Sequence, residues 1–233
     1  MTDSIKLIGN VASPYTRKMI AYLRYKRIPY EVIWGQPEDV LKKMNIEPPK
    51  PILLPVFILD RDGQATAVTD STPLIREFEE KYPDRSVLPK DPALNFINFI
   101  LEDFGDEWCT KFMFHYRWYF DEDADNAGTI LPLGINSSLK DDELAFFKEH
   151  FAKRQIDRLW VVGSSKETAE FIDKSYKNVL SIFEEQFKKH PFLLGNFPSS
   201  CDFAVYGQFT QLVGFDPTPR RIAHEISPRT VAY

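Results

Sequence analysis

The chain has 233 residues, enough for one large domain or two of moderate size. Its apolar fraction of 43% and its 19 Phe, 10 Tyr and 4 Trp exclude a chain dominated by disorder. The net charge of −5 provides no positive surface for duplex nucleic acid or an anionic membrane. Two cysteines in this length exclude a disulfide framework and favour a reducing compartment.

The N-terminal residues lack the basic flank and apolar stretch of a secretory signal. No segment approaches the ~18 uncharged apolar residues that a membrane-spanning helix needs. We therefore expect a soluble, cytoplasmic protein, with neither nucleic acid nor a membrane as its partner.

The first third of the chain alternates between the apolar periods of strands and helices. Arg61-Asp62-Gly63 between two apolar runs is a strong hairpin signal, and prolines open two of the helices. The elements expected in chain order are a strand at 5–9, a helix at 16–27, a strand at 30–34, a helix at 37–44, paired strands at 55–60 and 65–69, and a helix at 73–82.

This order predicts an α/β domain. Two strand–helix–strand passes imply parallel strands with right-handed crossovers, and the closing hairpin adds an antiparallel edge. The result is a mixed four-stranded sheet with helices on both faces. Prolines among polar residues between 82 and 92 indicate an exposed connector and a domain boundary.

After the connector the strand pattern disappears, which predicts an all-α second part. Residues 117–141 contain glycines and prolines and are expected to form a long irregular insertion. Helical periodicity resumes over 142–161, 167–189 and 202–213, and a further helix is expected to begin where the sequence ends. Seven residues are expected to follow one side of a long helix before the insertion: Phe96, Phe99, Ile100, Phe104, Trp108, Phe112 and His115.

Ser13-Pro14-Tyr15-Thr16 joins the first strand to the first helix. Serine is a favoured N-cap and proline a favoured first helical residue, so an ordinary helix start accounts for the pattern. The same turn would also present a hydroxyl at the positive end of a helix, where thiolates and other anions are stabilised. The spacing matches a Cys-x-x-Cys redox turn, but Ser13 and Thr16 replace both sulfurs. Dithiol exchange by the protein itself is therefore excluded at this turn.

Two further turns each allow a structural and a functional interpretation. Leu54-Pro55 opens a strand, either as an edge-strand terminator or with a cis bond that turns the preceding backbone N–H and C=O towards an extended ligand. Asp70-Ser71 precedes a helix, either as a cap or as a ligand site. In the second case helix N–H groups and Ser71 Oγ receive a carboxylate, and Asp70 pairs with an ammonium. An α-amino acid end would fit both groups.

The three turns in this order of strands and helices resemble the cytosolic glutathione S-transferase family over nearly the whole chain. The resemblance implies a thioredoxin-like, glutathione-binding domain at 1–84, a linker at 85–91, and an all-helical domain at 92–233 that lines a second-substrate pocket. It also implies that Ser13 hydrogen-bonds the glutathione sulfur, that Leu54, before the cis Pro55, pairs with the cysteinyl backbone, and that Asp70-Ser71 holds the γ-glutamyl end.

The helical part carries another feature of that family. Ser199 and Asp202 resemble its helix-initiating box, with Ser199 as N-cap and Asp202 as the reciprocal N3 partner, which is a structural role. The chain departs from the family at Leu53, where a lysine often helps to bind the glycyl carboxylate; Lys50 and Lys42 are the candidate substitutes. Four aromatic residues are candidates for the second-substrate pocket, although most are expected in the core: Tyr15, Trp108, Phe112 and Tyr116.

The function implied by the resemblance is that of a glutathione S-transferase, a homodimer that stabilises the thiolate of its co-substrate glutathione for attack on a small, mostly apolar electrophile. Two alternatives remain open: a non-catalytic binding or regulatory protein of the same fold, and a glutathione-dependent peroxidase or isomerase. The four histidines are scattered without metal-ligand spacing, so no metal is expected.

Overall fold

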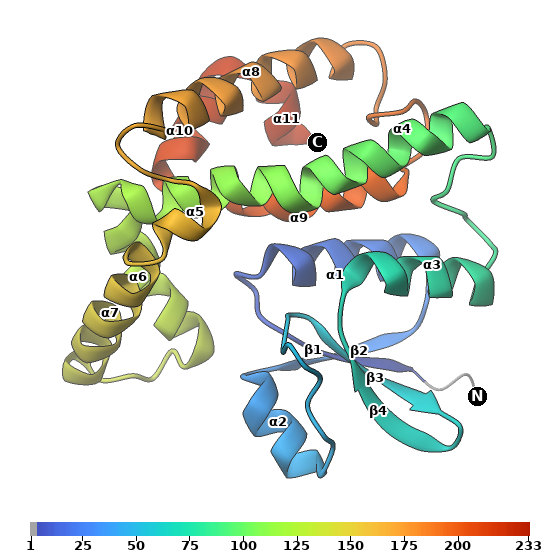
Figure 1. The fold of residues 1–233 in the computed structure, drawn as a ribbon, viewed down its shortest axis with the longest axis horizontal. Helices are drawn as coiled ribbons and strands as arrows, with labels where there is room; N and C mark the ends of the chain where they lie inside the picture. The colour runs from blue at the N-terminus through green and yellow to red at the C-terminus, as the bar shows by residue number, and fades with distance from the viewer. Residues whose placement is uncertain (1–3) are drawn as a thin grey trace.

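The computed structural model describes residues 4–233. Its N-terminal part is a four-stranded sheet in the order β2-β1-β3-β4, with helices on both faces (Figure 1). The elements are β1 (Ile5–Gly9), α1 (Pro14–Lys26), β2 (Tyr30–Trp34), α2 (Pro37–Met44), β3 (Val56–Arg61), β4 (Gln64–Val68) and α3 (Ser71–Lys81).

The sheet is mixed, as the sequence predicts, but only one of its pairs is parallel. Strand β1 pairs in parallel with β2, whereas β3 runs antiparallel to both β1 and β4. The expectation that the second strand–helix–strand pass would give another parallel strand is therefore wrong. The proline-rich segment 45–55 carries the chain back, so that β3 enters the sheet from the opposite end.

Helices α1 and α3 cover the sheet face that looks towards the helical part, and α2 covers the other face (Figure 1). The first face is sealed by a core that includes Leu7, Phe57 and Phe78. A smaller core around Ile8, Leu41 and Val56 lies under α2. Burial of these side chains fixes α1, and with it the turn at its N-terminus, against the sheet.

The part that follows is helical. Its elements are α4 (Pro92–Asp103), the π-helical turn η1 (Phe104–Trp108), α5 (Cys109–Tyr119), α6 (Asp121–Ile135), α7 (Asp141–Ile156), the 3-10 turn η2 (Leu159–Val162), α8 (Ala169–Phe187), α9 (Ser200–Leu212), α10 (Pro217–Ile226) and α11 (Pro228–Ala232). The expected α/β-plus-helical architecture is thus confirmed. Within residues 4–233, no helix has the length and apolarity needed to cross a bilayer.

The expectation of an irregular insertion at 117–141 is wrong, because α5 and α6 occupy most of this segment. Three acidic residues fill the first turn of α6, where the helix dipole favours negative charge. Gly128 is a site of close packing, since a Cβ there would lie 3.0 Å from Lys148 Cγ on α7. Packing of α6 against α7 thus outweighs the helix-breaking tendency of Pro132, which lies inside α6.

The apolar stripe expected along the first long helix does not form the core. Four of its seven residues are between 48% and 64% exposed: Phe96, Phe99, Ile100 and Trp108. The buried side of α4 instead carries the polar residues Asn98 and Glu102. Turn η1 then shifts the helical phase, because a π-helical turn holds an extra residue, and Phe112 and His115 beyond it are buried.

Helices α1 and α9 pack against each other at the junction of the two parts (Figure 1). Gly207 permits their close approach, since a Cβ there would lie 2.5 Å from the Pro14 carbonyl oxygen and 3.1 Å from Lys18 Cβ. Phe203 meets Tyr22 edge to face, with ring centroids 5.9 Å apart. The helix that begins at Ser13 is therefore held between the sheet and α9.

A capping box closes the N-terminus of α9. The Asp202 carboxylate accepts hydrogen bonds from the Ser199 N–H at 2.7 Å and the Leu193 N–H at 2.8 Å. The Tyr233 hydroxyl donates to Asp202 Oδ1 at 2.8 Å, so the residue after α11 also binds the capping carboxylate. The carboxylate thereby joins three segments of the helical part.

Candidate functional site

A cavity of about 700 Å³ lies where the α/β part faces the helical part. One wall brings together the three turns singled out from the sequence, through Ser13, Leu54 and Asp70–Ser71. The opposite wall includes Arg154 and Arg158, from the end of α7 and the segment after it. The volume of the cavity is that of a site for a small organic molecule.

Ser13 is the N-cap of α1 and is half-buried at the cavity wall. Its Oγ accepts a hydrogen bond from the Thr16 N–H at 3.2 Å. Within residues 4–233 the Ser13 hydroxyl hydrogen has no acceptor. Ser13 can therefore donate a hydrogen bond to an anion in the cavity, at the positive end of a helix.

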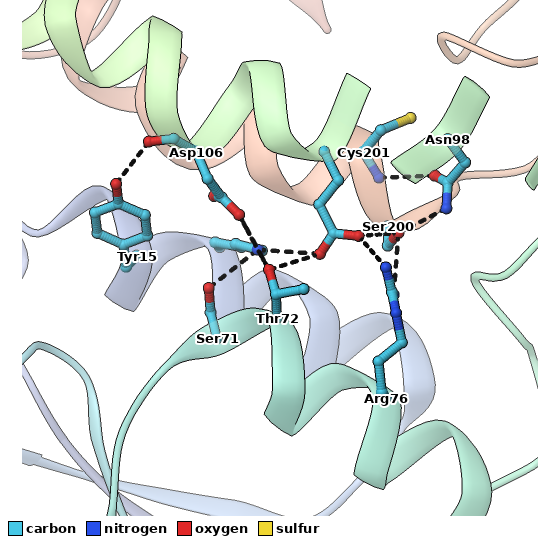
Figure 2. Close-up of polar contacts among 10 residues, drawn as sticks. Tyr15, Ser71, Thr72, Arg76, Asn98, Asp106, Ser200 and Cys201 are labelled. Carbon is cyan, nitrogen blue, oxygen red and sulfur yellow. Dashed lines mark hydrogen bonds and ion pairs between the residues drawn. The ribbon is translucent and has the colours of Figure 1, made fainter. Parts of the chain in front are cut away.

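Tyr15 also lines the cavity, but its hydroxyl is already engaged. It donates to the Asp106 carbonyl oxygen at 2.7 Å (Figure 2). Burial raises the pKa of Tyr15 to about 12, so the phenol stays neutral near pH 7. Ser13, rather than Tyr15, offers a free hydroxyl hydrogen.

The second turn presents unpaired backbone. The Leu54–Pro55 peptide bond is cis, and so is the Lys50–Pro51 bond. Among the described residues, neither the N–H nor the C=O of Leu54 has a hydrogen-bond partner. Because Leu54 lines the cavity, these groups are available to an extended ligand backbone.

The third turn begins α3. Asp70 precedes this helix with φ of 83°, a left-handed conformation that is costly for a residue other than glycine and that clusters at functional sites. Its side chain is exposed and caps no helix N–H. Ser71 is buried beside it. The pair places one carboxylate and one hydroxyl at the N-terminus of α3, and their role in binding a ligand stays a prediction.

Comparison with known proteins connects this geometry to a family. The family model for the glutathione S-transferase N-terminal domain matches residues 7–86. The match covers the α/β part of the chain. No curated protein sequence matches the chain significantly.

Solved structures that share the fold of the whole chain include glutathione S-transferases. The transferase CsGST83044 of Ceriporiopsis subvermispora, in complex with glutathione, has a TM-score of 0.60 and 19% identity, over 100% of this chain and 96% of that one. A glutathione S-transferase from Rhodospirillum rubrum has a TM-score of 0.58 and 18% identity, over 98% and 85%. FzlA from C. crescentus has a TM-score of 0.57 and 15% identity, over 98% and 90%.

A buried polar network lies behind the turns at Ser13 and Asp70–Ser71 and was not found from the sequence. Lys18 of α1 is its centre, with Nζ 3.0 Å from Ser71 Oγ, 2.6 Å from Asp106 Oδ2 and 3.3 Å from Glu102 Oε1. Figure 2 labels Ser71 and Asp106 among the members of this network. Glu102 also receives Arg76 and the Ser200 hydroxyl, each at 2.6 Å. The network links α1 and α3 to α4, η1 and α9.

The two carboxyls of the network differ in their pKa. Burial acts to raise the pKa of Glu102, but Lys18, Ser200 and Arg76 hold it below its usual value. Burial dominates at Asp106 and raises its pKa despite the Lys18 ammonium. Asp106 Oδ1 is buried without a hydrogen-bond partner among the described residues. The only signal in the sequence is a lysine within the apolar run of the first helix.

The aromatic residues proposed for the second-substrate pocket are separated by the structure. Phe112 and Tyr116 lie in the core of the helical part. Their ring centroids are 6.0 Å and 5.1 Å, respectively, from the ring centroid of Tyr176. Trp108 is exposed and does not line the cavity. Of the four candidates, Tyr15 alone reaches it.

The positive charge at the cavity also differs from expectation. Leu53 lines the cavity, whereas the candidate substitutes Lys42 and Lys50 do not. Arg154 and Arg158 supply the cations, and neither forms an ion pair within residues 4–233. Sequence reasoning missed them, because their position depends on the α6–α7 hairpin.

Proposed function

We propose that this chain binds glutathione in the cavity and uses Ser13 to stabilise its thiolate for attack on a small electrophile. The observation that carries the proposal is the free Ser13 hydroxyl hydrogen, placed at the N-terminus of α1 in the same cavity as Leu54 and Asp70–Ser71. The glutathione bound in the Ceriporiopsis subvermispora structure supports the choice of ligand.

The cavity wall provides complementary groups along the tripeptide. The Leu54 backbone pairs with the cysteinyl unit, and Asp70–Ser71 receives the ammonium and carboxylate of the γ-glutamyl end. The glycyl carboxylate pairs with Arg154 or Arg158, since Leu53 has no charge to offer.

The chemistry follows from the pKa of the thiol. A free cysteine-like thiol has a pKa of about 8.5 and is mostly protonated at neutral pH. A hydrogen bond from Ser13 and the positive end of α1 favour the thiolate, and a shift of about two units, worth about 2.7 kcal/mol, makes it dominant. The thiolate sulfur then bonds to the electrophilic atom, and the leaving group departs with the displaced electron pair.

Titration with glutathione in a calorimeter, in two buffers of different ionisation enthalpy near neutral pH, tests the proposal. Binding should release most of one proton. Ser13→Ala should bind glutathione with nearly unchanged affinity but release little proton, whereas the matched control Tyr15→Phe should release as much as the wild type. Binding without proton release would favour a non-catalytic binding protein, and absence of binding would refute the proposal.

The same fold carries other roles, as the name of the neighbouring beta-etherase LigF from Sphingobium sp. shows. A glutathione-dependent peroxidase or isomerase would need the same thiolate at Ser13. Assays with a peroxide, an isomerisable substrate and an aryl halide would separate these activities from conjugation.

We propose further that the chain is a homodimer. Helix α4 exposes an apolar face that a second copy can cover, made of Phe96, Ile97, Phe99 and Ile100. Sedimentation should give a dimer for the wild type and a monomer for Phe96→Asp/Phe99→Asp. A monomeric wild type would contradict this assignment.

The free, buried Cys109 and Cys201 fit a reducing compartment such as the cytoplasm.

A further inference from the structure

The Ser71 hydroxyl oxygen accepts a hydrogen bond on its buried side, which decides what the hydroxyl group can offer a ligand. Ser71 Oγ lies 3.0 Å from Lys18 Nζ, and this is its only hydrogen bond within residues 4–233. An ammonium group donates and cannot accept, so Ser71 Oγ is the acceptor of this bond. The single hydroxyl hydrogen must therefore point elsewhere. Ser71 lines the cavity, which leaves that hydrogen free for a ligand.

Lys18 is itself held firmly. Its side chain is 1% exposed, and Asp106 and Glu102 form ion pairs with it at 2.6 Å and 3.3 Å. Thr72 Oγ1 is a further acceptor at 3.3 Å (Figure 2). The ammonium group therefore contacts acceptors from α3, α4 and η1, which hold it beside Ser71.

We infer that Lys18 is a positioning residue for the α-carboxylate of the ligand, a role that rests on the proposed binding of glutathione. Because Lys18 donates a hydrogen bond to the Ser71 oxygen from the protein interior, the Ser71 hydroxyl hydrogen is left to donate into the cavity. A carboxylate there accepts this hydroxyl together with the free N–H groups at the start of α3. Without the ammonium, nothing fixes the Ser71 oxygen as an acceptor on its buried side, and the hydroxyl is free to present its lone pairs to the ligand.

The test compares ligands that differ by one group. Affinities of wild type and Lys18→Met are measured by calorimetry for glutathione, for γ-aminobutyryl-cysteinyl-glycine, which lacks the α-carboxylate, and for glutaryl-cysteinyl-glycine, which lacks the α-ammonium. Lys18→Met should weaken binding of glutathione and of the glutaryl peptide by about tenfold or more. It should leave the affinity for the γ-aminobutyryl peptide unchanged, because that peptide has no carboxylate for Ser71 to bind.

Two variants keep the test decisive. If Lys18→Met does not fold, Lys18→Met/Asp106→Asn removes one charge of each sign and should give the same ligand pattern. The matched control Arg76→Met removes the other cation of the network, which pairs with Glu102 but does not contact Ser71. It should lower the melting temperature and leave the ratio of the three affinities unchanged.

A double-mutant cycle checks that Lys18 acts through Ser71. The losses of glutathione affinity in Lys18→Met and Ser71→Ala should not add in the double variant. Equal weakening of all three peptides by Lys18→Met, or additive losses with Ser71→Ala, would overturn the inference while leaving glutathione binding intact. A wild type that binds none of the peptides would overturn the proposed function as well.

Discussion

Replacement of Asp202 by alanine should destabilise the protein far more than the loss of an ordinary helix cap. The buried carboxylate accepts the N–H groups of Ser199 and Leu193 and the hydroxyl of Tyr233. Loss of the cap costs about 0.5–2 kcal/mol. A buried Leu193 N–H left without a partner adds about 1–3 kcal/mol.

Part of this loss is offset, because burial raises the pKa of the Asp202 carboxyl and its charge no longer needs to be buried. We therefore expect the free energy of unfolding to fall by about 2–4 kcal/mol. For a chain of this length, the melting temperature should drop by about 5–15 °C.

Thermal unfolding followed by circular dichroism measures the effect. The matched control is Asp91→Ala, which removes the N-cap of α4, where one exposed carboxylate accepts, within residues 4–233, only the Leu94 N–H at 2.8 Å. This control should cost about 0.5–2 kcal/mol. If Asp202→Ala loses no more stability than Asp91→Ala, the argument that Asp202 joins three segments is refuted.

Three other predictions concern the packing of α9 on α1, acid stability and charge recognition. Gly207→Ala should lower the melting temperature, because its Cβ would meet the backbone of α1 at 2.5 Å, whereas a Cβ at Gly134 meets nothing within 4 Å and Gly134→Ala should not. Burial lowers the pKa of His115 to about 4, so the folded state binds its proton less readily than the unfolded state. Stability should then be lost as the pH falls from about 6.5 towards 4, by about 3 kcal/mol, and urea unfolding of His115→Phe should show a smaller acid loss. Arg154→Ala/Arg158→Ala should weaken binding of glutathione but not of its glycyl monoethyl ester; equal weakening of both ligands would show that these arginines do not bind that carboxylate.

The three turns of the candidate site were predictable, because each depends on local chemistry. Ser13 is recognisable as an N-cap because a proline follows it, and Asp70–Ser71 lies where a strand gives way to a helix. The order of strands and helices then brings these turns to one end of the sheet. The direction of β3 in the sheet could not be predicted in this way, because it does not depend on local chemistry. The proline-rich segment before β3 reverses the chain, and the spacing of apolar residues carries no information about such a reversal.

The rest of the site depends on partners distant in sequence. Glu102 and Asp106 are buried because Lys18, more than 80 positions earlier, neutralises them. A pattern search that expects apolar residues inside therefore chose the wrong face of α4. Likewise, Pro132 favours a loop, yet α6 forms because α7 packs on it, and that hairpin brings Arg158 to the cavity.

The central claim is that Ser13 lowers the pKa of a bound thiol. The ultraviolet absorbance of the thiolate, followed across pH with glutathione bound to the wild type and to Ser13→Ala, tests it most directly. The wild type should titrate about two units below the free thiol, and Ser13→Ala should raise the pKa of the bound thiol towards the free value of about 8.5. The same thiol pKa in both proteins would contradict the account.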